Sequence, residues 1–126
     1  MAKKEHIPTK RASENVYQRH YGRDKKDSDN ITIYVEYIWN RPHTICIISN
    51  QCSESCMEYY GDFDIENCII INDEAAQKLA NKFSARDEKT LVSRMANRFR
   101  IYGKDAFCKI EDWLKQKGIE YSSGIY

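Results

Sequence analysis

Apolar and polar residues alternate over the first segment that we expect to fold. Over residues 31–39 every second residue is apolar, and β-branched and aromatic side chains dominate, which is typical of a strand that buries one face. Residues 44–49 are apolar on both faces, as in a central strand, and Pro42 indicates the turn between the two. With further strands expected over 56–60 and 63–71, the pattern predicts a mainly antiparallel meander of four strands.

The spacing of apolar residues changes at Asn72 to that of a helix. Asn72 is a suitable N-cap, because its side chain can accept a hydrogen bond from the first helical turn. The spacing predicts three helices: one over 73–83, one that begins near Asp87 and ends at Gly103, and one that ends at Gly118. Strands followed by helices favour an α+β fold, with the three helices packed on one face of a small antiparallel sheet.

Residues 1–30 are polar and carry an excess of positive charge. Over residues 1–26, eight Lys and Arg residues stand against three Asp and Glu residues, although the formal net charge of the whole chain is only +1. We expect residues 1–30 to form a basic, flexible arm, with one or two helical turns from Ser13 to Tyr21, and residues 31–126 to form a single domain. Such an arm favours nucleotides or nucleic acid as partners, and the alternative is a solubilising tail.

Composition and cysteine usage indicate an intracellular protein. The 126 residues contain no run of the roughly 18–20 apolar residues that a membrane-spanning helix requires, and no apolar segment follows the basic N-terminus as in a secretory signal. Five cysteines are an odd number, which is typical of free thiols in a reducing compartment. We therefore expect a cytoplasmic protein without a membrane partner.

Four cysteines are the candidates for a metal site. Cys46, Cys52, Cys56 and Cys68 are separated by five, three and eleven residues, whereas zinc ligands usually come in pairs two to four residues apart. Only Cys52 and Cys56 have that spacing. Cys46 and Cys68 lie in apolar segments, where a free cysteine behaves as a small hydrophobic residue. The pattern favours structural thiols over zinc, and no cofactor is expected.

Signals of catalysis are weak. Asp62, Asp64 and Glu66 alternate along one segment and could bind a metal ion for phosphoryl chemistry, but the same spacing is typical of the solvated face of a strand. The sequence contains no G-x-S-x-G, Walker A or G-x-G-x-x-G motif. We therefore expect no enzymatic activity, and a metal-dependent enzyme that uses the cysteines or the carboxylates is the second alternative.

A group of residues late in the second predicted helix is the main candidate for a ligand site. Arg94 and Arg98 are four residues apart and share a helix face, and Arg100 and Tyr102 follow. Arginine forks bind phosphate, and tyrosine can stack on a base. The alternative is a solvated face whose arginines stabilise the helix dipole and cover apolar surface. Basic residues of the arm are predicted to assist in binding: Arg19, Arg23, Lys25 and Lys26.

Residues 75–83 and 90–97 resemble the two helices of a bacterial helix-turn-helix repressor segment. In that motif a short turn with a glycine places the second helix in the major groove of DNA. Here the connection, residues 84–88, is longer and contains no glycine, so the chain departs from the pattern where the two helices join. The resemblance implies a nucleic-acid-binding regulator that uses residues 73–102 and the basic arm, which is the first alternative function.

The chain as a whole resembles, in character rather than in any motif, the small proteins carried by phages and mobile elements. Many of these act by binding, among them inhibitors of host defence and scavengers of signalling nucleotides. We predict a non-enzymatic binding protein that occludes a protein partner or sequesters an anionic ligand, a nucleotide or a nucleic acid, with counter-defence inhibition as one expected role. A homodimer is also expected, because an exposed sheet edge can pair with a second copy.

Overall fold

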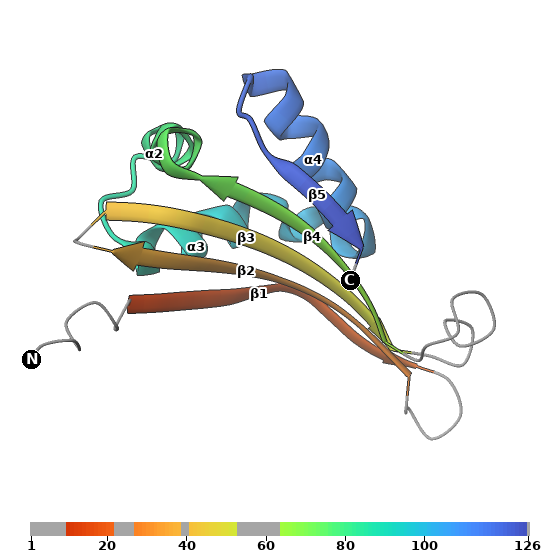
Figure 1. The fold of residues 1–126 in the computed structure, drawn as a ribbon. Helices are drawn as coiled ribbons and strands as arrows, with labels where there is room; N and C mark the ends of the chain where they lie inside the picture. The colour runs from red at the N-terminus through yellow and green to blue at the C-terminus, as the bar shows by residue number, and fades with distance from the viewer. Residues whose placement is uncertain (1–9, 22–26, 39–40, 53–63, 126) are drawn as a thin grey trace, which may run out of the picture.

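The computed structural model describes residues 10–21, 27–38, 41–52 and 64–125. These residues form one antiparallel sheet of five strands, and the strands follow the same order in the sheet as in the chain (Figure 1). The strands are β1 (Lys10–Tyr21), β2 (Asp27–Ile38), β3 (Arg41–Cys52), β4 (Asp64–Asn72) and β5 (Ser122–Ile125). β1 and β5 therefore form the two edges of the sheet.

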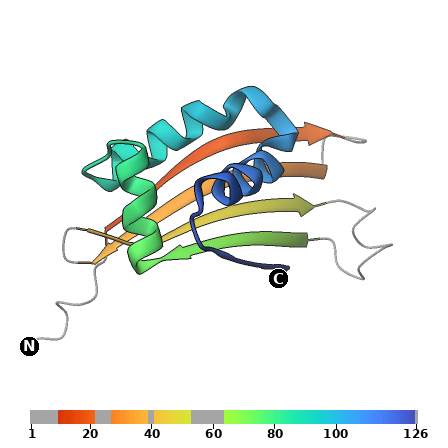
Figure 2. The same cartoon turned by 90° about the horizontal axis from the view of Figure 1, so that it is seen from above.

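The helices lie together on one face of this sheet (Figure 2). They are α2 (Asp73–Lys82), α3 (Glu88–Phe99), the 3-10 helix η3 (Arg100–Asp105) and α4 (Ala106–Lys117). α2 packs against β3 and β4, and α3 packs against β1 and β2. This arrangement confirms the predicted α+β class, with an antiparallel sheet covered on one side. None of the helices in the described ranges is both long and apolar enough to cross a membrane.

Branched apolar side chains from the three central strands form the core under the helices. The strand registers place Ile33 of β2 opposite Ile47 of β3, and Ile47 opposite Ile69 of β4. All three side chains are fully buried, and they share one core cluster with Leu91 and Met95 of α3. Complete burial of each such side chain contributes about 1.5–3 kcal/mol. The central strands predicted over 31–39 and 44–49 are thus confirmed as the main support of the core.

The helical part consists of two segments, the second of them kinked at Gly103, rather than of the three separate helices predicted. α2 is the first, and α3, η3 and α4 follow one another over residues 88–117 without an intervening loop. Gly103, at φ 54° and ψ −127°, bends the second segment instead of ending it, because a residue without a Cβ can adopt this conformation. Gly118, at φ 68°, does end α4. Its carbonyl accepts a hydrogen bond from Lys78 Nζ at 3.1 Å, which ties α2 to the end of α4.

β1 is the largest difference from the fold expected from the sequence. Residues 10–21 form a strand, where we expected part of a flexible arm with helical turns. Residues 27–30 belong to β2, so the sheet begins at Lys10 and not at Ile31. The other residues of the expected arm, 1–9 and 22–26, lie outside the described residues, as does the strand expected over 56–60.

A β-bulge explains why the sequence pattern concealed β1. The register moves from Asn15 opposite Thr32 to Tyr17 opposite Ile31, which leaves Val16 as an extra residue. Val16 and Tyr17 both pack against the core although they are adjacent in sequence. Two neighbouring side chains on the same face of the sheet interrupt the alternation, with its period of two, on which strand prediction depends.

Asn72 precedes α2, as predicted, but its side chain does not cap the helix. Instead its Oδ1 accepts a hydrogen bond from Thr44 Oγ1 at 3.2 Å across the ladder between β3 and β4. Asp73 then has φ 50°, which is uncommon for a residue with a side chain, and turns the strand directly into the helix. The expected cap therefore serves the sheet, because β4 continues to its last residue before the helix.

Asp87 is the N-cap of α3 and confirms that the second helical segment begins where the sequence predicted. Its Oδ1 accepts a hydrogen bond from the Thr90 N–H at 2.7 Å, and its Oδ2 accepts one from Thr90 Oγ1 at 3.0 Å. These bonds, above all the one from the backbone N–H, lower the pKa of Asp87 from its ordinary value of 3.8. The charged carboxylate therefore stabilises the folded state.

Replacing Asp87 by Ala should lower the Tm at neutral pH, and Asp87→Asn, which keeps an acceptor oxygen, should lower it less. Because the pKa is lowered in the folded state, the stabilisation is present above pH 3.8 and is lost as the pH falls through the folded-state pKa. The difference in Tm between wild type and Asp87→Asn should therefore shrink in acid. Thermal unfolding followed by circular dichroism would measure it, and a constant difference from about pH 7 to about pH 2 would contradict this role of the carboxylate.

Candidate functional site

The four residues predicted to bind an anion together do not converge on one site. Arg94 and Arg98 belong to α3, and Arg100 and Tyr102 belong to η3. Their side chains are directed to three different neighbours: the end of α2, the strand β1 and the helix α4. Only Arg98 and Tyr102 line the same groove.

Arg94 stabilises the connection between α2 and α3. Its Nη1 donates hydrogen bonds to the carbonyl oxygens of Phe83 at 2.8 Å and Ser84 at 2.9 Å. Ser84 has φ 53°, so the guanidinium holds a strained turn and satisfies carbonyls that the end of α2 leaves without helical partners. Charge-assisted hydrogen bonds of this kind commit the side chain to the fold.

Arg100 joins the end of α3 to the edge of the sheet. Its Nη1 donates to Asn97 Oδ1 at 2.6 Å, and its Nη2 donates to the backbone carbonyl of Asn15 at 3.0 Å. The same Nη2 lies 3.4 Å from Glu14 Oε1. This guanidinium is therefore largely satisfied by β1 and by its own helix, and a ligand would have to displace these contacts to use it.

Arg98 and Tyr102 line a groove of about 210 Å³ between α3, η3 and α4, which we call the α3–α4 groove. Phe99 also belongs to its wall on the α3 side. The residues from α4 complete the lining: Lys109, Asp112, Trp113 and Gln116. The lining thus holds two cations and one carboxylate together with aromatic rings, and the local charge favours an anion.

Aromatic rings form a packed floor in the α3–α4 groove. The ring centroids of Phe99 and Trp113 lie 6.0 Å apart at 81°, and those of Phe99 and Tyr102 lie 6.4 Å apart at 37°. Phe99 is only 2% exposed, whereas Tyr102 is 38% exposed. Such edge-to-face and tilted contacts hold rings in fixed positions, so a planar group that enters the groove meets an aromatic surface already in place.

Cationic groups lie against these rings. Lys109 Nζ is 5.6 Å from the centroid of the Tyr102 ring, and Arg98 Cζ is 5.8 Å from that of Phe99. Lys117 Nζ, just outside the lining, is 5.9 Å from the Trp113 centroid. Cations within about 6 Å of a ring are attracted to its face. The arrangement places positive charge beside exposed aromatic surface, as is typical of sites that bind a base and its phosphate.

The contribution of α4 to this groove was not predicted from the sequence. Neither Lys109 nor Trp113, which both line it, was among the candidate residues. A signal was present, because Lys109, Trp113 and Gln116 are spaced as neighbours on one helix face. What the sequence could not show is that the bend at Gly103 brings this face next to Arg98.

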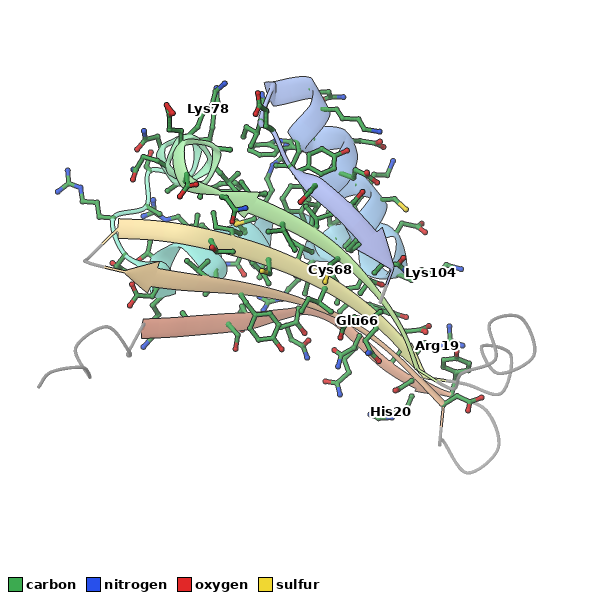
Figure 3. All side chains as sticks on the ribbon, in the orientation of Figure 1. Arg19, His20, Glu66, Cys68, Lys78 and Lys104 are labelled. Carbon is green, nitrogen blue, oxygen red and sulfur yellow. The ribbon has the colours of Figure 1, made fainter. Side chains whose placement is uncertain are left out.

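The basic residues that were expected to assist lie elsewhere or outside the described residues. Arg19 is exposed on β1, with its Cζ 4.9 Å from the centroid of the Tyr21 ring, at one end of the sheet (Figure 3). It does not line the α3–α4 groove. Arg23, Lys25 and Lys26 lie outside the described residues, so their predicted assistance stays a prediction.

Two of the cysteine candidates lie on neighbouring strands. Cys46 of β3 is half-buried, and Cys68 of β4 is buried near the middle of the sheet (Figure 3). Burial, together with the charge of Glu66, raises the pKa of the Cys68 thiol. A raised pKa favours the protonated thiol over the thiolate that binds zinc. Their environment is that of small core and sheet residues.

The other candidate metal ligands are not described. The side chains of Cys52, Asp62 and Asp64 lie outside the described residues, as does Cys56. Among the side chains that the structure describes, no three of the His, Cys, Asp and Glu residues gather closely enough to hold a metal ion. The metal-dependent enzyme therefore stays an untested prediction from the sequence.

A second polar pocket, of about 410 Å³, lies where α2 begins beside β4 and β5. Its lining includes Asp73, Glu74 and Glu120, so its charge disfavours an anion. Tyr121 also lines it, and its hydroxyl donates a hydrogen bond to Glu111 Oε2 at 2.8 Å. Desolvation, supported by this hydrogen bond, raises the pKa of Tyr121 to about 12, so the phenol stays neutral and ties the C-terminal segment to α4.

Comparisons with protein-family models, with curated proteins and with solved structures found no significant match to this chain. Its function must therefore be inferred from its own side chains.

Replacing Gly103 by Ala should destabilise the fold and distort the α3–α4 groove. The conformation at φ 54° and ψ −127° is strained for any residue with a Cβ, and we expect a loss of roughly 1–3 kcal/mol in the free energy of unfolding. A steric clash is not the cause, since a Cβ would lie 3.9 Å from the Tyr17 ring. Urea unfolding would measure the loss, with Gly118→Ala as the comparison at a terminal αL position. Unchanged stability of Gly103→Ala would show that the bend does not require glycine.

Proposed function

We propose that this protein is a non-enzymatic binding protein that holds an anionic ligand, a nucleotide unit, in the α3–α4 groove. The observation that carries the proposal is the placement of Arg98 and Lys109 beside the rings of Phe99 and Tyr102. The guanidinium and ammonium groups would bind phosphate, and the accessible rings of Tyr102 and Trp113 would stack on a base, above the buried ring of Phe99. Base stacking on an aromatic side chain contributes about 1–3 kcal/mol.

The size of the groove favours a single nucleotide unit. Its volume of about 210 Å³ is below the roughly 300–1,000 Å³ of pockets that enclose a whole drug-sized ligand. A nucleotide would therefore be held on one side and stay partly exposed to solvent. Both a free nucleotide and one unit of a single strand fit this description, and their salt dependence distinguishes them, because a strand releases many more counterions on binding.

The chemistry of the lining supports binding rather than catalysis. Among the described residues that line the groove there is no Ser, Cys or His, and Asp112 is the one carboxylate. A nucleophile with an adjacent general base, the usual requirement of covalent or acid–base catalysis, is therefore not among the lining residues. Sequestration of a nucleotide is compatible with the phage-like, counter-defence role predicted from the character of the sequence.

The alternative in which α2 and α3 bind DNA as a helix-turn-helix has less support. α3 packs against β1 and β2, so one of its faces is occupied by the sheet. Its first turn carries Glu88, preceded by the exposed Asp87 cap. In a helix-turn-helix the beginning of the second helix contacts the bases, and two carboxylates there would oppose the phosphates. A single strand in the α3–α4 groove is the form of nucleic-acid binding that the charges favour.

Reversing the charge of the groove tests the proposal. The double variant Arg98→Glu/Lys109→Glu should weaken the binding of nucleoside monophosphates by roughly tenfold or more, because it removes charge-assisted hydrogen bonds and introduces repulsion. Arg86→Glu/Lys115→Glu makes the same change of charge at exposed residues outside the groove and should bind as the wild type does. Isothermal titration calorimetry would measure both, at low and at physiological salt.

Tryptophan fluorescence gives an independent measurement. The chain has two tryptophans, so Trp39→Phe leaves Trp113 as the one reporter. A base stacked in the groove should quench its emission, and the quenching should disappear in the double variant. Nucleotide binding that survives Arg98→Glu/Lys109→Glu, or the absence of any nucleotide binding by the wild type, would reject this function.

A further inference from the structure

The outer edge of β1 is a second surface of the molecule that lies apart from the α3–α4 groove. β1 is the first strand in the sheet order and pairs with β2 on one side. No other strand in the described ranges pairs with its outer side, and Figure 2 shows α3 running alongside β1. An edge strand with unpaired backbone groups is a template for an additional strand.

The direction of the free backbone groups follows from one hydrogen bond. The carbonyl of Asn15 accepts from Arg100 Nη2, which belongs to η3 and not to the sheet, so this carbonyl is directed away from β2. In an antiparallel strand the N–H and C=O of one residue point to the same side, and this side alternates from residue to residue. The N–H and C=O of Ser13 therefore also point outward, in the half of the strand before the bulge at Val16.

The two halves of this edge differ. After Val16 the bulge twists the strand, and at Asn15 the carbonyl is already occupied by Arg100; both features protect an edge from pairing. Before Asn15 the backbone of residues 10–14 has neither protection. The accessible template is therefore a short, defined stretch.

A groove of about 810 Å³ runs between this stretch and α3. We call it the β1–α3 groove. Its apolar lining residues are Ala12 of β1 and the buried Val92 of α3, and Ser93 and Asn97 contribute polar groups. An additional strand on β1 would place every second side chain against α3. A short apolar side chain would then contact Ala12 and Val92, while the polar groups of α3 would be available to its neighbours.

The charges of the β1–α3 groove identify the class of its occupant. Glu14 and Glu88 stand against Lys89 and Arg94, and Arg94 is committed to the carbonyls at the end of α2. The lining is thus close to neutral, in contrast to the cationic α3–α4 groove. A nucleic acid would bring phosphates against two carboxylates. A polypeptide in extended conformation has a neutral backbone. Its own C=O and N–H groups can pair with the outward N–H and C=O of Ser13.

We infer that the β1–α3 groove binds an extended segment of a partner protein, which adds a sixth strand to the sheet along residues 10–14 and inserts a small apolar side chain between β1 and α3. This mode of recognition takes its affinity from main-chain hydrogen bonds and its specificity from the groove. The surface is separate from the nucleotide site, so the protein could hold a ligand and a protein partner at the same time.

Two substitutions at Ser13 distinguish the contribution of its backbone N–H to binding from that of its side chain. Ser13→Pro removes the outward N–H and places the ring against the incoming strand, yet it breaks no bond to β2, and proline is tolerated at such edge positions. Ser13→Ala keeps the N–H and is the matched control. Random peptides of about ten residues displayed on phage, long enough to cover the free edge, would be selected on the wild-type protein.

Peptides selected in this way should bind wild type and Ser13→Ala equally and should bind Ser13→Pro roughly tenfold or more weakly, as measured by fluorescence polarisation. Methylation of single backbone nitrogens in a selected peptide should abolish binding at alternate positions, which is a signature of strand pairing that needs no variant of the protein.

The inference is overturned if no peptide is enriched, if binding survives Ser13→Pro, or if methylation has no alternating effect. It is also overturned if analytical ultracentrifugation finds a dimer that Ser13→Pro dissociates, because the occupant is then a second copy, or if single-stranded DNA binds in a manner that Ser13→Pro abolishes. None of these outcomes depends on nucleotide binding in the α3–α4 groove, so the two proposals fail separately.

Discussion

The structure depends on the burial of one face of the sheet beneath the helices. β2, β3 and β4 each direct β-branched residues to this face, and the registers stack them in rows such as that of Ile33, Ile47 and Ile69. A sheet with such a face is not stable in water until another layer covers it. α2 and α3 provide that layer. β1 takes part for the same reason, since Val16 and Tyr17 extend the apolar surface under α3.

The α3–α4 groove is a continuation of this core to the surface. Phe99 is buried and belongs to the core cluster, and its ring also contacts the ring of Trp113 in the groove. Trp113 in turn packs against Phe83, with ring centroids 5.3 Å apart. The floor of the groove is therefore rigid for the same reason that the core is rigid. The exposed cationic side chains of Arg98 and Lys109 would lose conformational freedom on binding the proposed ligand, whereas the packed rings would lose little.

α3 separates two surfaces of different chemistry. Along its length it contributes residues such as Ser93 and Asn97 to the side that faces β1, and Arg98 and Phe99 at its end to the side that faces α4. The side that faces β1 has balanced charges and lies next to the unpaired backbone groups of the β1 edge. The side that faces α4 has positive charge next to aromatic rings. The occupants that we propose for these two sides, an extended polypeptide and an anionic aromatic ligand, differ accordingly, although one helix contributes to both sides.

Local pattern and tertiary structure determined different parts of this protein. Alternation and helical spacing were sufficient to predict the α+β class, the strands around residues 31–38, 44–49 and 64–71, and the start of α3 at Asp87, because each depends on residues close in sequence. The same reasoning missed β1, since a bulge hides its alternation, and it divided the helices at Gly103, since a glycine can bend a helical segment as well as end it.

The candidate site, like the fold, was predicted only in part from local pattern. The sequence identified Arg98 and Tyr102 as candidates, but it also grouped with them Arg94 and Arg100. The guanidinium groups of these two bind backbone carbonyls of other segments, the turn after α2 and the strand β1. It gave no reason to include Lys109 or Trp113. Which arginine faces a groove and which holds the fold together depends on contacts between segments distant in sequence. Residue type and spacing set the chemistry that is available, and only packing of the helices against the sheet decided where that chemistry meets the solvent.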